Sequence, residues 1–154
     1  AISVALVLQA LMFGDGGITA IAANCFNMAV VMPFSAYYLY KLISGNTEIT
    51  SSRRVIAAAI AGYISLVVAA ACTGFEFGIQ PLLHHTAAGV PLYMPYPLSV
   101  TVPAMVLEHV FGFGILEALV TALIFAYIQK TDTSLLYGEE SSMRKKKMKK
   151  VSTA

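Results

Sequence analysis

Long uncharged runs constrain the fold of this chain more than any other feature. Asp15 is the only charged residue between Ala1 and Tyr40, and two further apolar runs follow residues 54 and 99. A bilayer core about 30 Å thick is crossed by about 20 apolar helical residues, whose backbone hydrogen bonds are all made within the segment. Charged residues are 12% of the 154 residues, against roughly 25% in average soluble domains. The sequence therefore predicts an all-α, polytopic integral membrane helical bundle.

About four membrane segments are expected. Residues 1–12 are apolar but too few to cross a bilayer, and they predict the last part of a span. This suggests a piece of a longer protein, and no signal peptide pattern precedes Ala1. Complete spans are predicted at residues 18–42, 55–75 and 100–127. Residues 1–130 would form the membrane domain, and residues 131–154 a polar, basic tail.

Prolines shape two parts of this plan. Pro33 lies inside the span at residues 18–42, where it removes a helical hydrogen bond and should kink the helix. Residues 76–99 contain Pro81 and three later prolines, which argues against a long helix there. We expect an interfacial or re-entrant loop with a short helix, packed on the bundle.

Small residues recur at helical spacing in the span at residues 55–75. They are Ala58, Gly62, Ser65 and Ala69. Such residues let two helices approach closely in a membrane. This face is also a candidate contact surface for a partner protein.

The distribution of positive charge predicts the orientation. Lys41, Arg53 and Arg54 flank one connector, and Lys130 begins the basic end of the chain. The positive-inside rule places both on the cytoplasmic side of the cell membrane. The Gly-rich turn and the His84-His85 loop would then lie outside. The basic tail would be disordered or lie on anionic lipid headgroups.

Three ionisable residues lie inside the last span. At about 100° per residue, Glu108 and Glu117 point to opposite sides, whereas His109 and Glu117 are about 80° apart and could share an interior face. Unpaired carboxylates are costly in the bilayer core. The cluster could form a polar path or metal environment, with His109 as a candidate ligand. It could equally be a hydrogen-bonded group that only fixes helix packing.

Other polar residues support similar alternatives. Asn24 and Asn27 share a helical face with Met28 and Met32, and their amides most simply face the bundle interior. Asp15 could cap a helix, bond turn amides or reach a pocket. No nucleotide-binding loop or nucleophile elbow is present, so the chain itself should not hydrolyse ATP.

One family resemblance is carried by several blocks of sequence. The residues 8–20, LQALMFGDGGITA, are followed by Ala23-Asn24-Cys25-Phe26-Asn27-Met28-Ala29 and Pro33-Phe34. The likeness continues through Met94-Pro95-Tyr96-Pro97 and residues 116–123, LEALVTAL. These blocks resemble the CbiM/NikM family, the substrate-binding membrane subunits of energy-coupling factor transporters for cobalt or nickel.

The resemblance implies a larger subunit of about seven spans, of which this chain is the C-terminal portion. It implies uptake of Co²⁺ or Ni²⁺ as transported ions, without a permanently bound cofactor. The implied partners are a transmembrane coupling subunit, cytoplasmic ATPase subunits and a small accessory membrane subunit. The family's main metal site uses an N-terminal Met-His segment and a histidine in an earlier helix, so the direct ligands are expected outside this chain. Asp15, Asn24, Asn27 and Glu117 match the resembling blocks and would support the pocket or its packing.

Two other functions remain open at this stage. A membrane metalloenzyme could use Glu76, His84, His85 and His109, provided that they converge on one metal. The adjacent histidines argue against this, because they do not have the i, i+4 spacing that places two imidazoles on one helical face. A non-catalytic assembly subunit would use its polar residues only for helix packing. We expect a transporter component that is not an enzyme and has no nucleic-acid partner.

Overall fold

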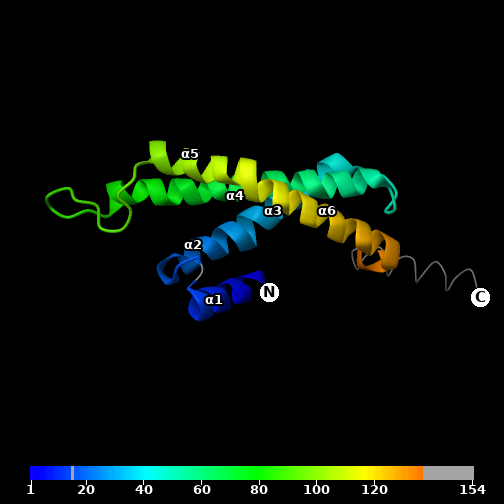
Figure 1. Ribbon diagram of the computed structural model, residues 1–154, viewed down its shortest axis with the longest axis horizontal. Coiled ribbons are helices and arrows are strands. Elements are labelled where there is room, and N and C mark those ends of the chain that lie inside the picture. The colour runs from blue at the N-terminus through cyan, green and yellow to red at the C-terminus, as the bar shows by residue number, and fades with distance from the viewer. Residues whose placement is uncertain (15, 137–154) are drawn as a thin grey trace, which may run out of the picture.

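The computed structural model describes residues 1–14 and 16–136, and this part of the chain is helical with no named β-strand (Figure 1). The predicted fold class is confirmed. The elements are α1 (Ile2–Phe13), the 3-10 turn η1 (Ile18–Ala20), α2 (Ile21–Phe26), the π-helical turn η2 (Asn27–Val31), α3 (Met32–Ser44), α4 (Ser52–Leu83), α5 (Leu98–Glu108), the π-helical turn η3 (His109–Phe113), α6 (Gly114–Thr131) and the 3-10 turn η4 (Thr133–Leu136). Asp15 and most of the predicted basic tail lie outside the described residues.

Three helical segments are long and apolar enough to cross a membrane. They comprise Ile18–Ser44, Ser52–Leu83 and Leu98–Thr131. The three complete spans predicted from the sequence are thus confirmed by length and composition. The shorter apolar helix α1 packs against α2.

The long helix α4 is the centre of the bundle. At about 1.5 Å per residue its 32 residues extend about 48 Å, and α3, α5 and α6 all pack along it. The small residues predicted to allow close helix packing are buried: Ala58, Gly62, Ser65 and Ala69. They are covered by the protein's own helices, so in this structure the close packing that they allow is between helices of the same chain.

Glycine is required where α4 meets α5. A Cβ atom added to Gly74 would lie 2.9 Å from Val102 Cα, and one added to Gly78 would overlap Leu98 and Thr101. Thr101 Oγ1 also donates a 2.7 Å hydrogen bond to the Gly74 carbonyl oxygen. The two helices therefore approach nearly to backbone contact, as small residues permit in membrane bundles.

The predicted loop at residues 76–99 is partly wrong. Helix α4 continues through Glu76, Gln80 and Pro81 and ends only at Leu83. Pro81 is tolerated because it lies in the last turn, where it removes one hydrogen bond close to the natural end of the helix. The remaining loop, residues 84–97, is mostly exposed and projects beyond the ends of α4 and α5 rather than packing along the bundle (Figure 1).

Two π-helical turns interrupt the outer helices. The first, η2, immediately precedes Pro33, at the site where the sequence predicts a kink. The second, η3, lies against Tyr63 of α4, whose hydroxyl donates a 2.9 Å hydrogen bond to the carbonyl oxygen of Val110. Wide turns leave backbone groups without their usual partners and occur often at functional sites.

The α3–α4 connector is held by one side chain. Arg54 donates from Nε to the Thr47 carbonyl oxygen at 2.9 Å and to the Glu48 carbonyl oxygen at 3.2 Å. Its Nη1 lies 3.0 Å from the Tyr40 hydroxyl. The end of α6 lies beside this connector, because Gln129 Nε2 donates to the Ser51 carbonyl oxygen at 3.2 Å. The two positively charged regions predicted to share one side of the membrane are therefore at the same end of the bundle.

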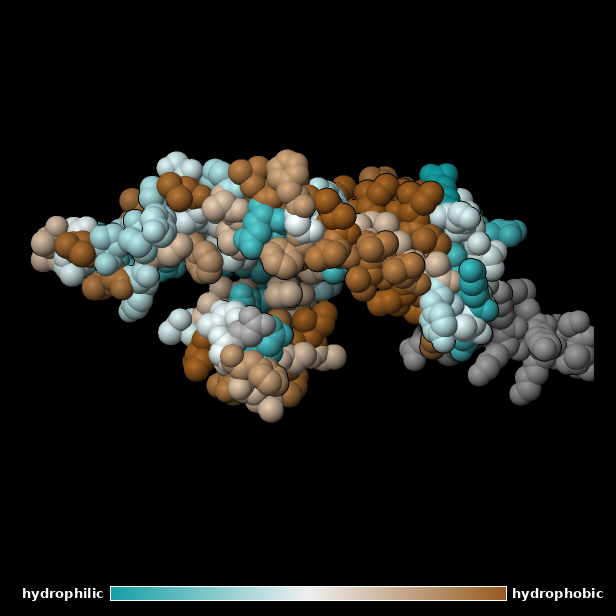
Figure 2. Space-filling view, viewed as in Figure 1, coloured by the Kyte–Doolittle hydropathy of each residue, from teal (hydrophilic) through white to brown (hydrophobic). Residues whose placement is uncertain are grey.

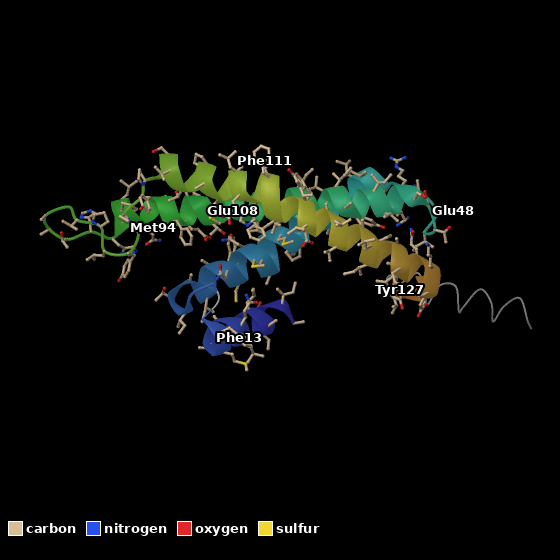
Figure 3. All side chains as sticks on the ribbon, viewed as in Figure 1. Phe13, Glu48, Met94, Glu108, Phe111 and Tyr127 are labelled. Carbon is tan, nitrogen blue, oxygen red and sulfur yellow. The ribbon has the colours of Figure 1, made fainter. Side chains whose placement is uncertain are left out.

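The ends and middle of the molecule differ in polarity. Figure 2 shows hydrophobic residues spread over the central part of the visible face, with hydrophilic residues at the connector end. Figure 3 places Glu48 at the connector end of α4 and Met94 near the opposite end. Large apolar side chains remain exposed on the outer helices, among them Leu107, Phe111 and Leu123. This arrangement suits a molecule whose flanks contact lipid or further protein segments.

Candidate functional site

A buried polar contact joins η2 to α4. Asn27 is 1% exposed. Its Nδ2 donates to Glu76 Oε2 at 2.7 Å and to Thr73 Oγ1 at 3.0 Å. The predicted interior position of Asn27 is thus confirmed, but its acidic partner was not anticipated. The sequence assigned Glu76 to a loop, which hid the fact that Thr73 and Glu76 lie three residues apart on one helical face.

The hydrogen-bond directions define this cluster further. Thr73 Oγ1 donates to the Ala69 carbonyl oxygen at 3.1 Å, so its hydroxyl must act as the acceptor toward Asn27. The amide nitrogen of Asn27 therefore faces Glu76, and the carboxylate receives a donor. The other amide atom, Asn27 Oδ1, is buried and has no hydrogen-bond partner among the described residues. A buried acceptor without a partner costs about 1–3 kcal/mol.

Glu76 also borders a cavity of about 500 Å³ at the end of the bundle that carries the His84–Pro97 loop. The cavity is lined by Thr19, Ala20, Ala23, Glu76, Phe77, Gln80, Tyr93 and Met94. It joins the start of the second segment, the last turns of α4 and the long loop. Glu76 is the only charged residue in this described lining.

A second carboxylate, Glu117 of α6, lies beside a cavity of about 430 Å³ between α3, α4 and α6. Thr121 Oγ1 donates to Glu117 Oε1 at 2.9 Å. Space for this pair depends on Gly62, where an added Cβ would lie 3.3 Å from Thr121 Oγ1 and 3.5 Å from Glu117 Oε1. Met28 and Met32 line the same cavity.

His109 and Glu117 border a common cavity, as helical periodicity predicted. This space of about 510 Å³ is also lined by Met28 and Leu66, whereas Glu108 is exposed and absent from the lining. His109 Nδ1 lies 2.8 Å from the Met105 carbonyl oxygen. Because a carbonyl oxygen only accepts, Nδ1 carries the proton, and in the neutral ring Nε2 offers a lone pair.

Asn24 of α2 is bonded to the Gly-rich turn, which in the sequence also includes Asp15. Asn24 Nδ2 donates to the Gly16 carbonyl oxygen at 2.8 Å. Gly16 has φ +75°, and an added Cβ there would overlap the Asn24 amide. Asn24 therefore secures the turn rather than facing a described cavity. The role predicted for Asp15 falls on a residue outside the described part of the chain.

The two loop histidines do not join the other polar residues. The His84 ring packs edge-on against Tyr93 at 5.4 Å, and the exposed His85 bonds locally, with Nδ1 3.0 Å from the Thr86 carbonyl oxygen. Within residues 1–14 and 16–136 no group of three His, Cys, Asp or Glu residues could hold a metal ion. The convergence that a metalloenzyme built on Glu76, His84, His85 and His109 requires is therefore contradicted.

Residues 1–135 match the family described as the cobalt uptake substrate-specific transmembrane region, CbiM. The chain belongs to this family. The CbiM match includes every polar residue discussed above, from Asp15 to Glu117.

The chain is also similar to individual transport proteins and to solved structures. The chain is 54% identical over 136 residues to the fused nickel transport protein NikMN of Rhodobacter capsulatus, covering 88% of this chain and 39% of the relative. It is 44% identical over 143 residues to a putative metal transport protein of Methanocaldococcus jannaschii, covering 93% of this chain and 60% of the relative. A crystal structure of a transition metal transporter superposes with TM-score 0.76 at 48% identity, covering 84% of this chain and 56% of that one. The chain thus spans less than two thirds of these relatives.

Proposed function

We propose that this chain is the C-terminal portion of the substrate-binding membrane subunit of an energy-coupling factor transporter, which takes up Co²⁺ or Ni²⁺. The observation that carries the proposal is the family match across residues 1–135. The relative that shares 54% identity is named for nickel, whereas the family is named for cobalt. Both ions suit nitrogen-rich sites, so the ligand chemistry favours neither.

The ion would bind outside and be released inside, powered by partner proteins. The partners in this proposal are a transmembrane coupling subunit, cytoplasmic ATPases and a small accessory membrane subunit. Arg53, Arg54 and Lys130 would face the cytoplasm, and the His84–Pro97 loop would face outside. The tail at residues 131–154 is assigned to the cytoplasm on the same ground. The chain itself would perform no catalysis.

The direct metal ligands are assigned to parts of the protein that this chain does not include. Asn27 and Glu117 are proposed to support the pocket, because Glu117 lines a cavity in an apolar bundle and the buried Asn27 is bonded to Glu76, which lines another. Asn24 would act through the Gly-rich turn that it secures. His109 remains a candidate ligand through Nε2, since its other nitrogen is bonded to Met105.

Uptake by cells that express the complete protein with its partners tests this proposal. Radioactive Ni²⁺ or Co²⁺ should accumulate, and Asp15→Ala or Glu117→Ala should lower accumulation at equal membrane abundance. Glu48→Ala is a matched control, because Glu48 is an exposed carboxylate in the connector and lines none of these cavities. Lack of uptake by the unchanged protein would overturn the proposed function. Normal uptake by both variants would overturn the assigned supporting roles.

A further inference from the structure

One carboxylate oxygen of Glu76 is held by a hydrogen bond. Thr73 Oγ1 donates to the Ala69 carbonyl oxygen, and the Asn27 amide group donates to both Thr73 Oγ1 and Glu76 Oε2. Of these groups, only the Asn27 amide donates to the Glu76 carboxyl group. Asn27 is almost fully buried, so the donor is held in place by packing.

Glu76 has no countercharge among the described residues that line its cavity. Among the eight lining residues there is no lysine, arginine or histidine. A neutral amide donor does not replace a countercharge, and an uncompensated carboxylate near the membrane is costly. The position reduces this cost, because Glu76 lies seven residues, or about 10 Å, before the end of α4 at Leu83. Water and small ions can therefore reach it from that end.

The same cavity is lined by residues whose side chains carry further oxygen atoms. Gln80 Nε2 donates to the Glu76 backbone carbonyl oxygen at 3.1 Å, which leaves Gln80 Oε1 available. Thr19, Tyr93 and Met94, which carry two hydroxyl groups and a thioether, also line the cavity. The cavity volume of about 500 Å³ easily contains an ion with six waters at about 30 Å³ each.

We infer that Glu76, oriented by Asn27 and with Gln80 beside it in the same cavity, forms a weak binding site for a hydrated divalent cation at the outer end of the bundle. A single carboxylate with neutral oxygen donors binds such ions weakly, with Kd on the order of 10⁻³ M, and discriminates little between them. The site would raise the local concentration of the transported ion before its tighter binding elsewhere. This role, and the placement of the site on the outer side of the membrane, rest on the proposed function. Ion binding at Glu76 does not depend on it.

Binding of Mn²⁺ to the purified full-length protein in lipid nanodiscs tests the site. The electron paramagnetic resonance signal of free Mn²⁺ is measured during titration, after one equivalent of Ni²⁺ has been added for any tight site. We expect one weak Mn²⁺ site. Glu76→Gln should weaken it at least tenfold, Gln80→Glu should strengthen it by adding a second carboxylate, and Glu48→Gln should leave it unchanged.

The outcomes separate the two proposals. Equal Mn²⁺ binding by the unchanged protein and Glu76→Gln, or no response to Gln80→Glu, would overturn the site. In transport, Glu76→Gln should raise the half-saturating Ni²⁺ concentration severalfold while the maximal rate stays close to normal. If the unchanged protein transports neither Ni²⁺ nor Co²⁺, the proposed function fails, yet the Mn²⁺ titration still decides whether Glu76 binds cations.

Discussion

The hydroxyl group of Tyr63 lies 2.9 Å from the carbonyl oxygen of Val110, across 47 positions of sequence. Val110 lies within the π-helical turn η3, and the neighbouring Gly114 sits directly against the Tyr63 ring. A Cβ atom at Gly114 would overlap the His109 carbonyl oxygen and lie 2.9 Å from Tyr63 Cε2. The wide turn, the glycine and the tyrosine therefore form one packing unit beside His109.

Removing the Tyr63 hydroxyl should loosen this unit. Tyr63→Phe leaves the ring in place but deprives the Val110 carbonyl oxygen of its donor, so we expect a loss of about 1 kcal/mol in the free energy of unfolding. Denaturant titration in mild detergent measures it. Tyr127→Phe is the matched control, because Tyr127 is 67% exposed. Equal stability of Tyr63→Phe and the unchanged protein would show that the bond contributes nothing.

Glycine substitutions should separate close packing from helix preference. Gly78→Ala should cost about 1–3 kcal/mol, because the new methyl group overlaps Leu98 and Thr101 on α5. Gly112→Ala should be neutral or stabilising by up to about 1 kcal/mol, since nothing lies within 4 Å of its added Cβ and alanine favours helices. Thermal unfolding of both variants would test this. The same loss in both would indicate that helix packing against Gly78 is not the cause.

The Asn27–Glu76 bond should show energetic coupling. Asn27→Ala removes the donor and leaves the carboxylate unpaired, whereas in a Glu76→Gln background the same change removes a bond to a neutral group. Hydrogen bonds to charged groups contribute about 1.5–3 kcal/mol, against about 1 for neutral pairs. A double-mutant cycle on the free energy of unfolding should therefore give a coupling of about 1 kcal/mol. Additive losses would mean that the two side chains do not interact in solution.

Asp132 should titrate below the ordinary range. The side-chain and backbone hydrogen bonds of Ser134 lower the pKa of its carboxyl group from 3.8. A lowered pKa in the folded protein means that the ionised form supports the η4 turn above pH 3.8, and that this support is lost as pH falls through the lowered pKa. Ser134→Ala should move the pKa back toward 3.8, while Thr133→Ala should not. Carboxyl carbon chemical shifts measured against pH provide the test.

The features of the fold that depend on local composition could be predicted from the sequence. The uncharged runs located all three long segments, the small residues of α4 predicted close packing, and helical spacing placed His109 and Glu117 on one cavity. Each of these features is decided by neighbours within a few turns.

The remaining features depend on contacts between distant positions. Pro81 suggested a helix break, but its effect depends on how near the helix end lies, and packing against α5 extends α4 beyond it. The pairing of Asn27 with Glu76 joins residues 49 positions apart. No periodicity within one segment could have identified that partner. The two π-helical turns also follow from tertiary contacts, such as Tyr63 on Val110, that sequence spacing does not encode.

The contacts of Arg54 have a mechanical consequence. One guanidinium group binds carbonyl oxygens on both Thr47 and Glu48 and the hydroxyl of Tyr40, so α3 and α4 are braced at their junction. At the far end of α4 only a mostly exposed loop leads to α5. Relative tilting of α3 and α4 is restrained by Arg54 at the connector and, about 33 Å further along α4, by the Asn27–Glu76 bond at the start of the same outer segment. Two attachments this far apart resist rotation of one segment against the other.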